Sequence, residues 1–142
     1  MRAIIAVTLA VGALWACGPA AAEILHFRAT LTGAAETPPN PTAGAGSAEL
    51  TLDTESKMLS WRVTYGGLSG PLTGAHFKAP PEPGSAPGSA VDFAPPLASP
   101  IVSSARLNDI EIGDLRAGLW SINLLTARSP HGEIRGDLER AP

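Results

Sequence analysis

Residues 131–139 read His-Gly-Glu-Ile-Arg-Gly-Asp-Leu-Glu and alternate a charged or polar residue with glycine, isoleucine or leucine. A period of two is typical of a β-strand with one buried face and one solvated face. The solvated face is predicted to carry a row of five side chains: His131, Glu133, Arg135, Asp137 and Glu139. The stretch therefore predicts an exposed polar ribbon that ends an all-β fold.

Three earlier segments, 25–31, 47–53 and 59–65, show the same alternation. Repeated patterning of this kind predicts an antiparallel sheet with one buried face per strand. The polar residues 53–56 separate two of these segments and predict a hairpin connection. Trp61 and Trp120 fall within predicted strands and are expected in the core.

The remaining segments are less regular. Residues 119–126 are predicted as a further strand, and residues 107–115 as a short helix capped by Asn108 or Asp109. Residues 79–100 are rich in Pro, Gly, Ser and Ala and predict a long surface loop, in which Val91, Phe93 and Leu97 can dock. Seven or eight short strands in about 120 residues predict an antiparallel Greek-key β-sandwich or a small barrel.

The first 22 residues are typical of a signal peptide, with Arg2 before an apolar stretch too short to span a bilayer. Small residues at 20–22 favour cleavage before Glu23, which defines a signal peptide at 1–22 and one domain at 23–142. A competing interpretation is a lipoprotein signal in which Cys17 is the lipidated residue. Either route predicts a periplasmic or secreted protein.

Composition excludes several functions. Cys17 is the single cysteine, so the mature chain has no disulfide, cysteine ligand or thiol nucleophile. Loss of Arg2 leaves 9 basic and 13 acidic residues, and this acidic balance without a basic run argues against nucleic acid and anionic membranes. The mature chain contains no second apolar segment of membrane-spanning length. It also lacks a Gly-x-Ser-x-Gly elbow, a phosphate loop and a dinucleotide fingerprint.

Five blocks, in order, carry a family resemblance: Leu-Thr-Gly-Ala-Ala-Glu-Thr-Pro-Pro at 31–39, Gly67-Leu68 with Thr-Gly-Ala-His at 73–76, Leu-Arg-Ala-Gly at 115–118, Asn123 with Thr126, and Gly-Glu-Ile-Arg-Gly at 132–136. Together they make the chain resemble the CHRD domain, named for its repeats in chordin and also found singly in exported bacterial proteins. The resemblance implies an immunoglobulin-like or Cu/Zn-superoxide-dismutase-like sandwich. It implies no particular enzymatic activity.

The chain departs from this family at positions where many relatives carry histidine. It has His76-Phe77-Lys78 where relatives have His-Ile-His, and Leu125 where they have a further histidine. The resemblance implies that three imidazoles could meet in those relatives, whereas Lys78 and Leu125 supply no ligand atom. His76 and His131 remain the candidate ligands of a weak Cu or Zn site, and we expect no resident cofactor.

Glu36, Asn123, Glu133 and Arg135 form the predicted polar cluster. One interpretation is an anion-binding Arg135 oriented by Glu133. The favoured interpretation is structural: Arg135 pairs with Glu36 or with a loop carbonyl and fastens a loop. We therefore expect a non-catalytic binding or structural domain whose partner is a protein or another envelope component. The alternatives are a dismutase-like metal-binding domain and, third, a hydrolase that uses Glu36 or Glu133.

Overall fold

The computed structural model describes residues 22–80 and 89–142, together with Gly12. Its elements are, in order, β1 (Ile24–Thr32), β2 (Ala45–Asp53), β3 (Met58–Gly66), β4 (Leu72–Lys78), β5 (Ser89–Asp92), β6 (Ile101–Arg106), α1 (Asp109–Arg116), β7 (Ser121–Thr126), β8 (Ile134–Asp137) and β9 (Glu139–Ala141). Apart from Gly12 and Ala22, the predicted signal peptide lies outside the described residues, as does part of the Pro-rich segment.

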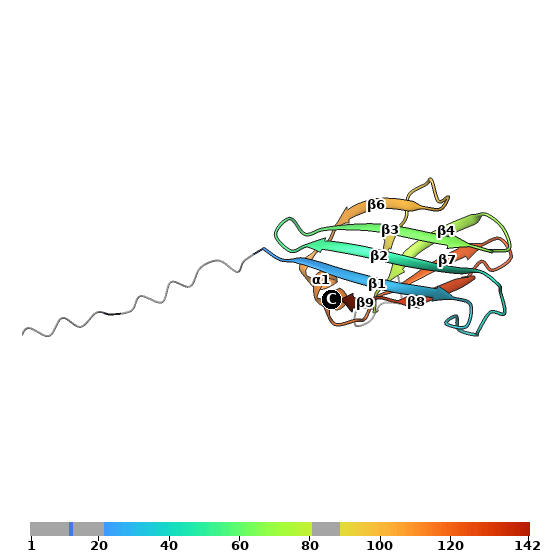
Figure 1. The fold of residues 1–142 in the computed structure, drawn as a ribbon, viewed down its shortest axis with the longest axis horizontal. Helices are drawn as coiled ribbons and strands as arrows, with labels where there is room; N and C mark the ends of the chain where they lie inside the picture. The colour runs from blue at the N-terminus through green and yellow to red at the C-terminus, as the bar shows by residue number, and fades with distance from the viewer. Residues whose placement is uncertain (1–11, 13–21, 81–88) are drawn as a thin grey trace, which may run out of the picture.

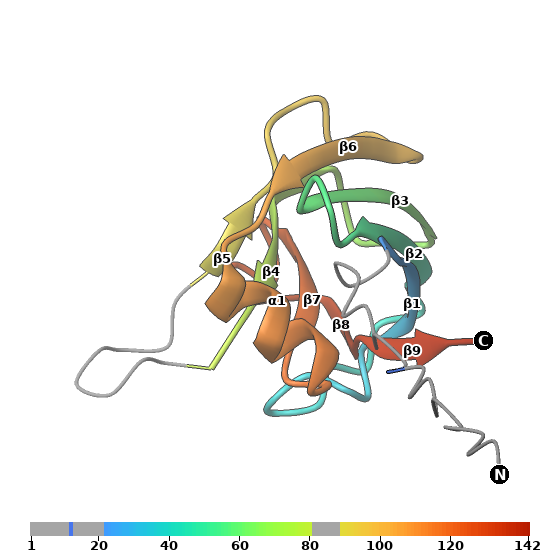
Figure 2. The ribbon, with the colours of Figure 1, turned by 90° about the vertical axis from the view of Figure 1, so that its left-hand side faces the viewer.

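The strands form one antiparallel sheet in the order β5-β4-β7-β8-β1-β2-β3-β6, with β9 paired to β1. Figures 1 and 2 show this sheet curving around a shared core until it nearly closes. The predicted antiparallel all-β class is confirmed. The described chain contains nine strands, which is more than the seven or eight expected.

The core follows the alternation of the sequence. In β1, for example, Leu25, Phe27 and Leu31 point inward, because every second residue of a strand faces the same side. An aromatic cluster fills the space between the two halves of the sheet, with Trp61 packed against Phe77 and Phe93 at centroid distances of 5.1 Å each. Trp120 is 1% exposed beside Phe77, which confirms the predicted burial of both tryptophans.

Helix α1 closes one end of the curved sheet (Figure 2). Its N-terminus has the predicted cap: Asn108 accepts from the Glu111 amide, and the Glu111 carboxylate accepts from the Asn108 amide. Leu115 is fully buried and faces the core. Within the described residues, no helix is long and apolar enough to cross a membrane.

The segment predicted as a long loop contains more regular structure than its composition suggests. Ser89–Asp92 forms β5 against β4, and Phe93 docks into the core as expected. Residues 101–106 form β6, a strand that the sequence did not predict. Because β6 is an edge strand whose residues are mostly exposed, its sequence lacks the alternating apolar residues that identify a strand.

The prediction of one continuous strand over residues 131–139 is wrong. β8 begins only at Ile134, and the pairing is interrupted at Leu138, whose amide donates to the Trp120 carbonyl. Glu133 lies before β8 and is 1% exposed, so it does not belong to a solvated row. The φ angle of Gly132 is +134°, which turns the chain out of the strand conformation and directs Glu133 toward protein donors.

Candidate functional site

The carboxylate of Glu133 is the centre of a buried hydrogen-bond cluster. Thr42 Oγ1 and Thr126 Oγ1 donate to it across 2.8 Å each. Ser69 donates twice, through its amide at 3.0 Å and through its hydroxyl. The donors come from the β1–β2 connection, the β3–β4 connection and β7, at the end of the sheet opposite α1 (Figure 1). Glu133 therefore ties three segments together at that end.

These hydrogen bonds decide the charge of Glu133. Burial alone would raise the pKa of its carboxyl group, but the bonds from Ser69, Thr42 and Thr126 outweigh burial and hold the pKa below its ordinary value. Glu133 is therefore ionised at neutral pH. Its charge is satisfied by protein donors on Ser69, Thr42 and Thr126.

Glu36 and Asn123 meet beside Gly132, in a second cluster. Glu36 is 8% exposed and Asn123 is 1% exposed. Asn123 Nδ2 donates to the carbonyl of His131 across 3.0 Å. Glu36 Oε1 and Asn123 Oδ1 are both buried without a hydrogen-bond partner. An added Cβ on Gly132 would lie 2.5 Å from Glu36 Oε1 and would also overlap Asn123 Oδ1, so only glycine fits here.

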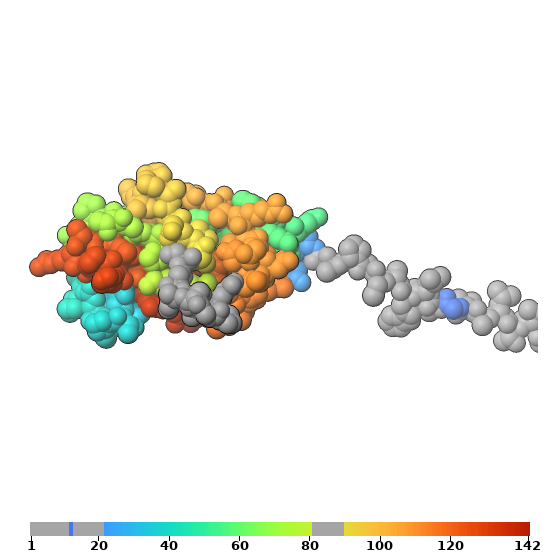
Figure 3. Space-filling model, turned by 180° about the vertical axis from the view of Figure 1, so that it is seen from behind, coloured from blue at the N-terminus to red at the C-terminus, as the bar shows by residue number. Residues whose placement is uncertain are grey.

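The loop that carries Glu36, residues 33–41, is anchored to the β7–β8 turn. Asn40 Nδ2 donates to Ser129 Oγ across 2.9 Å. Within the loop, the amides of Asn40 and Glu36 donate to the carbonyl of Gly33 at 2.8 and 3.1 Å. Figure 3 shows this loop, in cyan, beside the turn at about residue 130, in red. The packing therefore holds Glu36 against Asn123.

Arg135 lies on the same sheet face as this pair. His76 of β4, Asn123 of β7 and Arg135 of β8 are directly opposite one another across three strands. Arg135 makes no direct ion pair with Glu36, because the pairs within 4 Å among the described residues are Lys57–Asp109, His76–Asp92 and Arg116–Glu23. Its interaction with Glu36 is electrostatic at longer range.

The pKa of Glu36 is raised above its ordinary value. Burial is the largest cause, and the positive charges of Arg135 and Lys78 oppose it. Glu36 and Glu133 are thus both buried carboxyl groups whose pKa values move in opposite directions. The difference follows from the donors: Glu133 has four, whereas Glu36 Oε1 has none.

The two candidate metal ligands differ in their surroundings. His76 is partly buried, with Nδ1 3.9 Å from Asp92 Oδ1 and with Nε2 buried and unpartnered. Burial and the charge of Lys78 lower the pKa of His76, while Asp92 opposes them. His131 is exposed. Among the residues that the structure describes, no group of three His, Cys, Asp or Glu side chains is placed to hold a metal ion.

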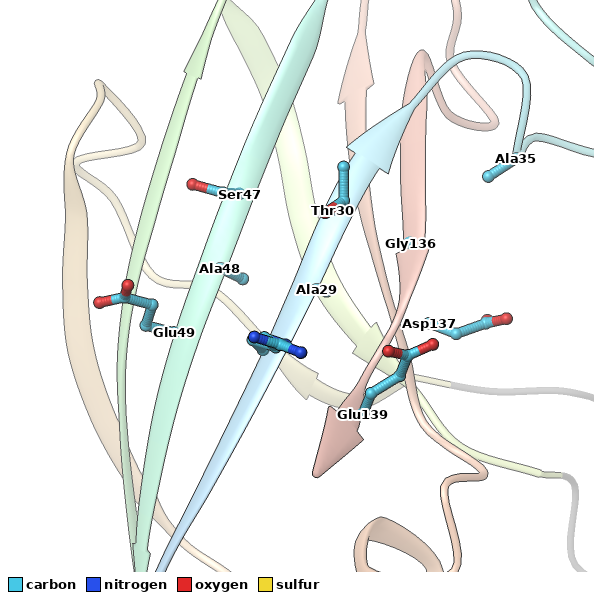
Figure 4. A pocket seen from close by; sticks show the side chains of 10 residues that line it. Ala29, Thr30, Ala35, Ser47, Ala48, Glu49, Gly136, Asp137 and Glu139 are labelled. Carbon is cyan, nitrogen blue, oxygen red and sulfur yellow. The ribbon is translucent and has the colours of Figure 1, made fainter. Parts of the chain in front are cut away.

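A separate surface pocket of about 350 Å³ lies over β1, β2 and the end of β8 (Figure 4). Figure 4 shows Glu49 on one side of β1, and Asp137 and Glu139 on the other. Arg28 is directly opposite both Glu49 and Glu139 in the strand pairing. The two glutamates are therefore separated by a guanidinium, and they do not form a pair of carboxylates facing across an open groove.

The structure thus divides the predicted polar cluster in two. Glu36, Asn123 and Arg135 share one sheet face, whereas Glu133 binds donors at the end of the sheet. The residues that sequence reasoning missed are the hydroxyl donors, above all Thr42 and Ser69. They lie 91 and 64 positions from Glu133, and hydroxyl residues in loops carry no pattern that identifies a distant partner.

The fold is an all-β domain, and the motif at 132–136 contains Glu133, the centre of the buried carboxylate cluster. The chain matches the CHRD domain family over residues 27–138 and belongs to that family. All four residues of the predicted polar cluster lie within the matched range. Comparison with curated proteins and with solved structures gave no match.

Proposed function

We propose that this CHRD-family protein is exported and that its mature domain is a non-catalytic binding or structural domain of the cell envelope, periplasmic or secreted. The observation that carries the proposal is the state of Glu133. A catalytic carboxylate must contact the substrate, either at the reacting atom or at a proton that the substrate carries. Glu133 is 1% exposed and, although it lines a surface pocket of about 450 Å³, its carboxylate already accepts hydrogen bonds from Thr42, Ser69 and Thr126. The family's closing motif therefore supports the fold rather than a reaction.

The surface pocket supports the same proposal. Its lining carries three carboxylates, those of Glu49, Asp137 and Glu139, and the guanidinium of Arg28, so this face is mixed in charge with a negative excess. Mixed charge without an assembled acid and base suits recognition of a partner surface better than bond cleavage. The partner is a protein or another envelope component.

Export is tested by the N-terminus of the protein recovered from the producing cell. We expect a chain beginning at Glu23 in the soluble envelope fraction or the medium, unchanged by Cys17→Ser. A bulky residue in Ala22→Phe should leave the precursor uncleaved, because the peptidase requires a small residue there. Membrane attachment that Cys17→Ser abolishes would replace this route with lipoprotein processing. Full-length protein in the cytoplasm would contradict export.

Calorimetric titration of the mature domain with Cu²⁺ and Zn²⁺ tests the competing metal-binding function. We expect wild type and His76→Ala to give the same small heats. Micromolar or tighter binding to wild type that His76→Ala removes would favour the dismutase-like alternative.

A binding role predicts that the mature domain, but not a Glu133→Ala variant with loosened loops, is retained by isolated envelope material. Equal retention of both would argue against a specific folded surface.

A further inference from the structure

The oxygens Glu36 Oε1 and Asn123 Oδ1 crowd the same point beside Gly132. Both are sealed from solvent and have no hydrogen-bond partner. The orientation of Asn123 is set by its amide nitrogen, which donates to the His131 carbonyl across 3.0 Å. The point that Glu36 Oε1 approaches to 2.5 Å lies 2.3 Å from Asn123 Oδ1 and 2.7 Å from Asn123 Nδ2, and this nitrogen makes no hydrogen bond to Glu36 Oε1. Two acceptors in this arrangement repel each other unless a proton lies between them.

The charged and titratable neighbours do not supply that proton. Lys78 on β4 and Arg135 on β8 act on Glu36 through their charge, without an ion pair within 4 Å. His76, also on β4 and opposite Asn123, has its Nδ1 on the side of Asp92, and its buried Nε2 makes no hydrogen bond to Glu36 Oε1 or to Asn123 Oδ1. The exposed His131 offers its carbonyl to Asn123, and loop 33–41 contains no titratable side chain besides Glu36. A proton on Glu36 itself is the donor that remains in the described part of the chain.

We propose that Glu36 is protonated in the folded domain and donates a hydrogen bond from Oε1 to Asn123 Oδ1. This bond is a pH-sensitive latch that holds loop 33–41 against the β7–β8 turn. When Glu36 loses its proton, the bond becomes a contact between a carboxylate and an amide oxygen, and the loop is released. The neighbouring cluster at Glu133 stays in place, because its carboxylate is already ionised and fully bonded.

The electrostatics agree with the geometry. Burial raises the pKa of Glu36, although Arg135 and Lys78 oppose the shift. A group whose pKa is higher in the closed state stabilises that state fully below its open-state pKa, and the contribution is lost as pH rises through the closed-state pKa. The opening constant of the loop should therefore rise about tenfold per pH unit between the two pKa values and level off above them.

Two measurements on the mature domain test the latch. The first is a ¹³C titration of the Glu36 carboxyl carbon, assigned by comparison with Glu36→Gln. We expect Glu36 to titrate above its ordinary pKa. The second is hydrogen exchange of the Asn40 amide, which donates to Gly33 within the loop at 2.8 Å. After correction for intrinsic exchange, its protection should fall with rising pH in wild type. In Glu36→Gln it should stay constant, since the glutamine amide donates to Asn123 Oδ1 at every pH.

The matched control is Glu49→Gln, an exposed carboxylate of β2 that should leave the wild-type profile unchanged. An ionised Glu36, held by the charges of Arg135 and Lys78 or bridged to Asn123 by a water, would titrate at or below its ordinary pKa and would give protection that falls with decreasing pH. Either result would overturn the proposal. The wild-type titration decides the question even if Glu36→Gln fails to fold.

Discussion

Thr126 Oγ1 donates to Glu133 Oε1 across 2.8 Å, and both residues are almost completely buried. This bond joins β7 to the segment that enters β8, and Ser69 and Thr42 extend it to two loops. The sheet is therefore closed in two different ways. At one end, α1 covers the core with Leu115. At the other end, the negatively charged carboxylate of Glu133 accepts hydrogen bonds from donors on three segments.

We predict that Glu133→Gln destabilises the domain by about 3 kcal/mol, because an amide accepts through one atom and leaves buried donors unpaired. Urea unfolding at neutral pH measures the change, with the exposed Glu49→Gln as the control. Since exchanging the carboxylate at position 49 disturbs no buried bond, that variant should unfold as wild type does. Equal midpoints for all three proteins would show that the Glu133 cluster contributes nothing to stability.

The Glu133 cluster should also make stability depend on pH. Hydrogen bonds lower the pKa of Glu133 in the folded state, so its contribution is present above the unfolded-state pKa and is lost as pH falls through the folded-state pKa. The difference in unfolding free energy between wild type and Glu133→Gln should therefore shrink in acid. This sign is opposite to that of the proposed Glu36 latch. A difference that grows in acid would mean that Glu133 is neutral when folded.

Gly132→Ala tests the close contact between Glu36 and Asn123. The new Cβ would overlap both side chains, and φ at this position is +134°, so we expect a loss of about 3 kcal/mol. Gly113→Ala is the matched control, because Gly113 lies in α1 with open space around its Cα and alanine favours a helix by about 0.5–1 kcal/mol. Thermal unfolding should shift down for the first variant and slightly up for the second.

Local patterns correctly predicted β1, β2, β3 and β7, the helix, and the burial of Trp61 and Trp120. Residues 25–31 alternate because one face of β1 is buried, and Asn108 caps α1 because its side chain bonds three residues ahead. Sequence reasoning failed where a residue's environment depends on distant segments. Glu133 continues an alternating pattern, yet Gly132 turns it inward to partners that no local pattern identifies. Edge strand β6 was not predicted for a related reason: most of its residues are exposed, so its sequence does not alternate apolar and polar residues.

Trp61→Ala should destabilise the domain by about 3–5 kcal/mol, because the ring is 4% exposed and packs against Phe77 and Phe93. The control is Val102→Ala, whose side chain is 67% exposed on β6 and should contribute little. Urea unfolding of both variants, read by circular dichroism, gives the comparison. A small loss in Trp61→Ala would mean that the aromatic cluster rearranges to fill the space.

Arg135→Gln separates the two possible roles of this arginine. If Arg135 fastened the loop directly, as the sequence suggested, its removal would lower the melting temperature markedly. In the part of the chain that the structure describes, Glu36 has no ion pair within 4 Å, and Arg135 lowers the pKa of Glu36 only through its charge. We therefore expect little change in stability at mildly acidic pH and a further rise in the pKa of Glu36, measured by ¹³C titration. Lys78→Gln should also raise the pKa of Glu36, but less strongly, because the charge of Lys78 lowers that pKa less than the charge of Arg135 does. A large loss of stability with an unchanged Glu36 titration would restore the direct fastening role.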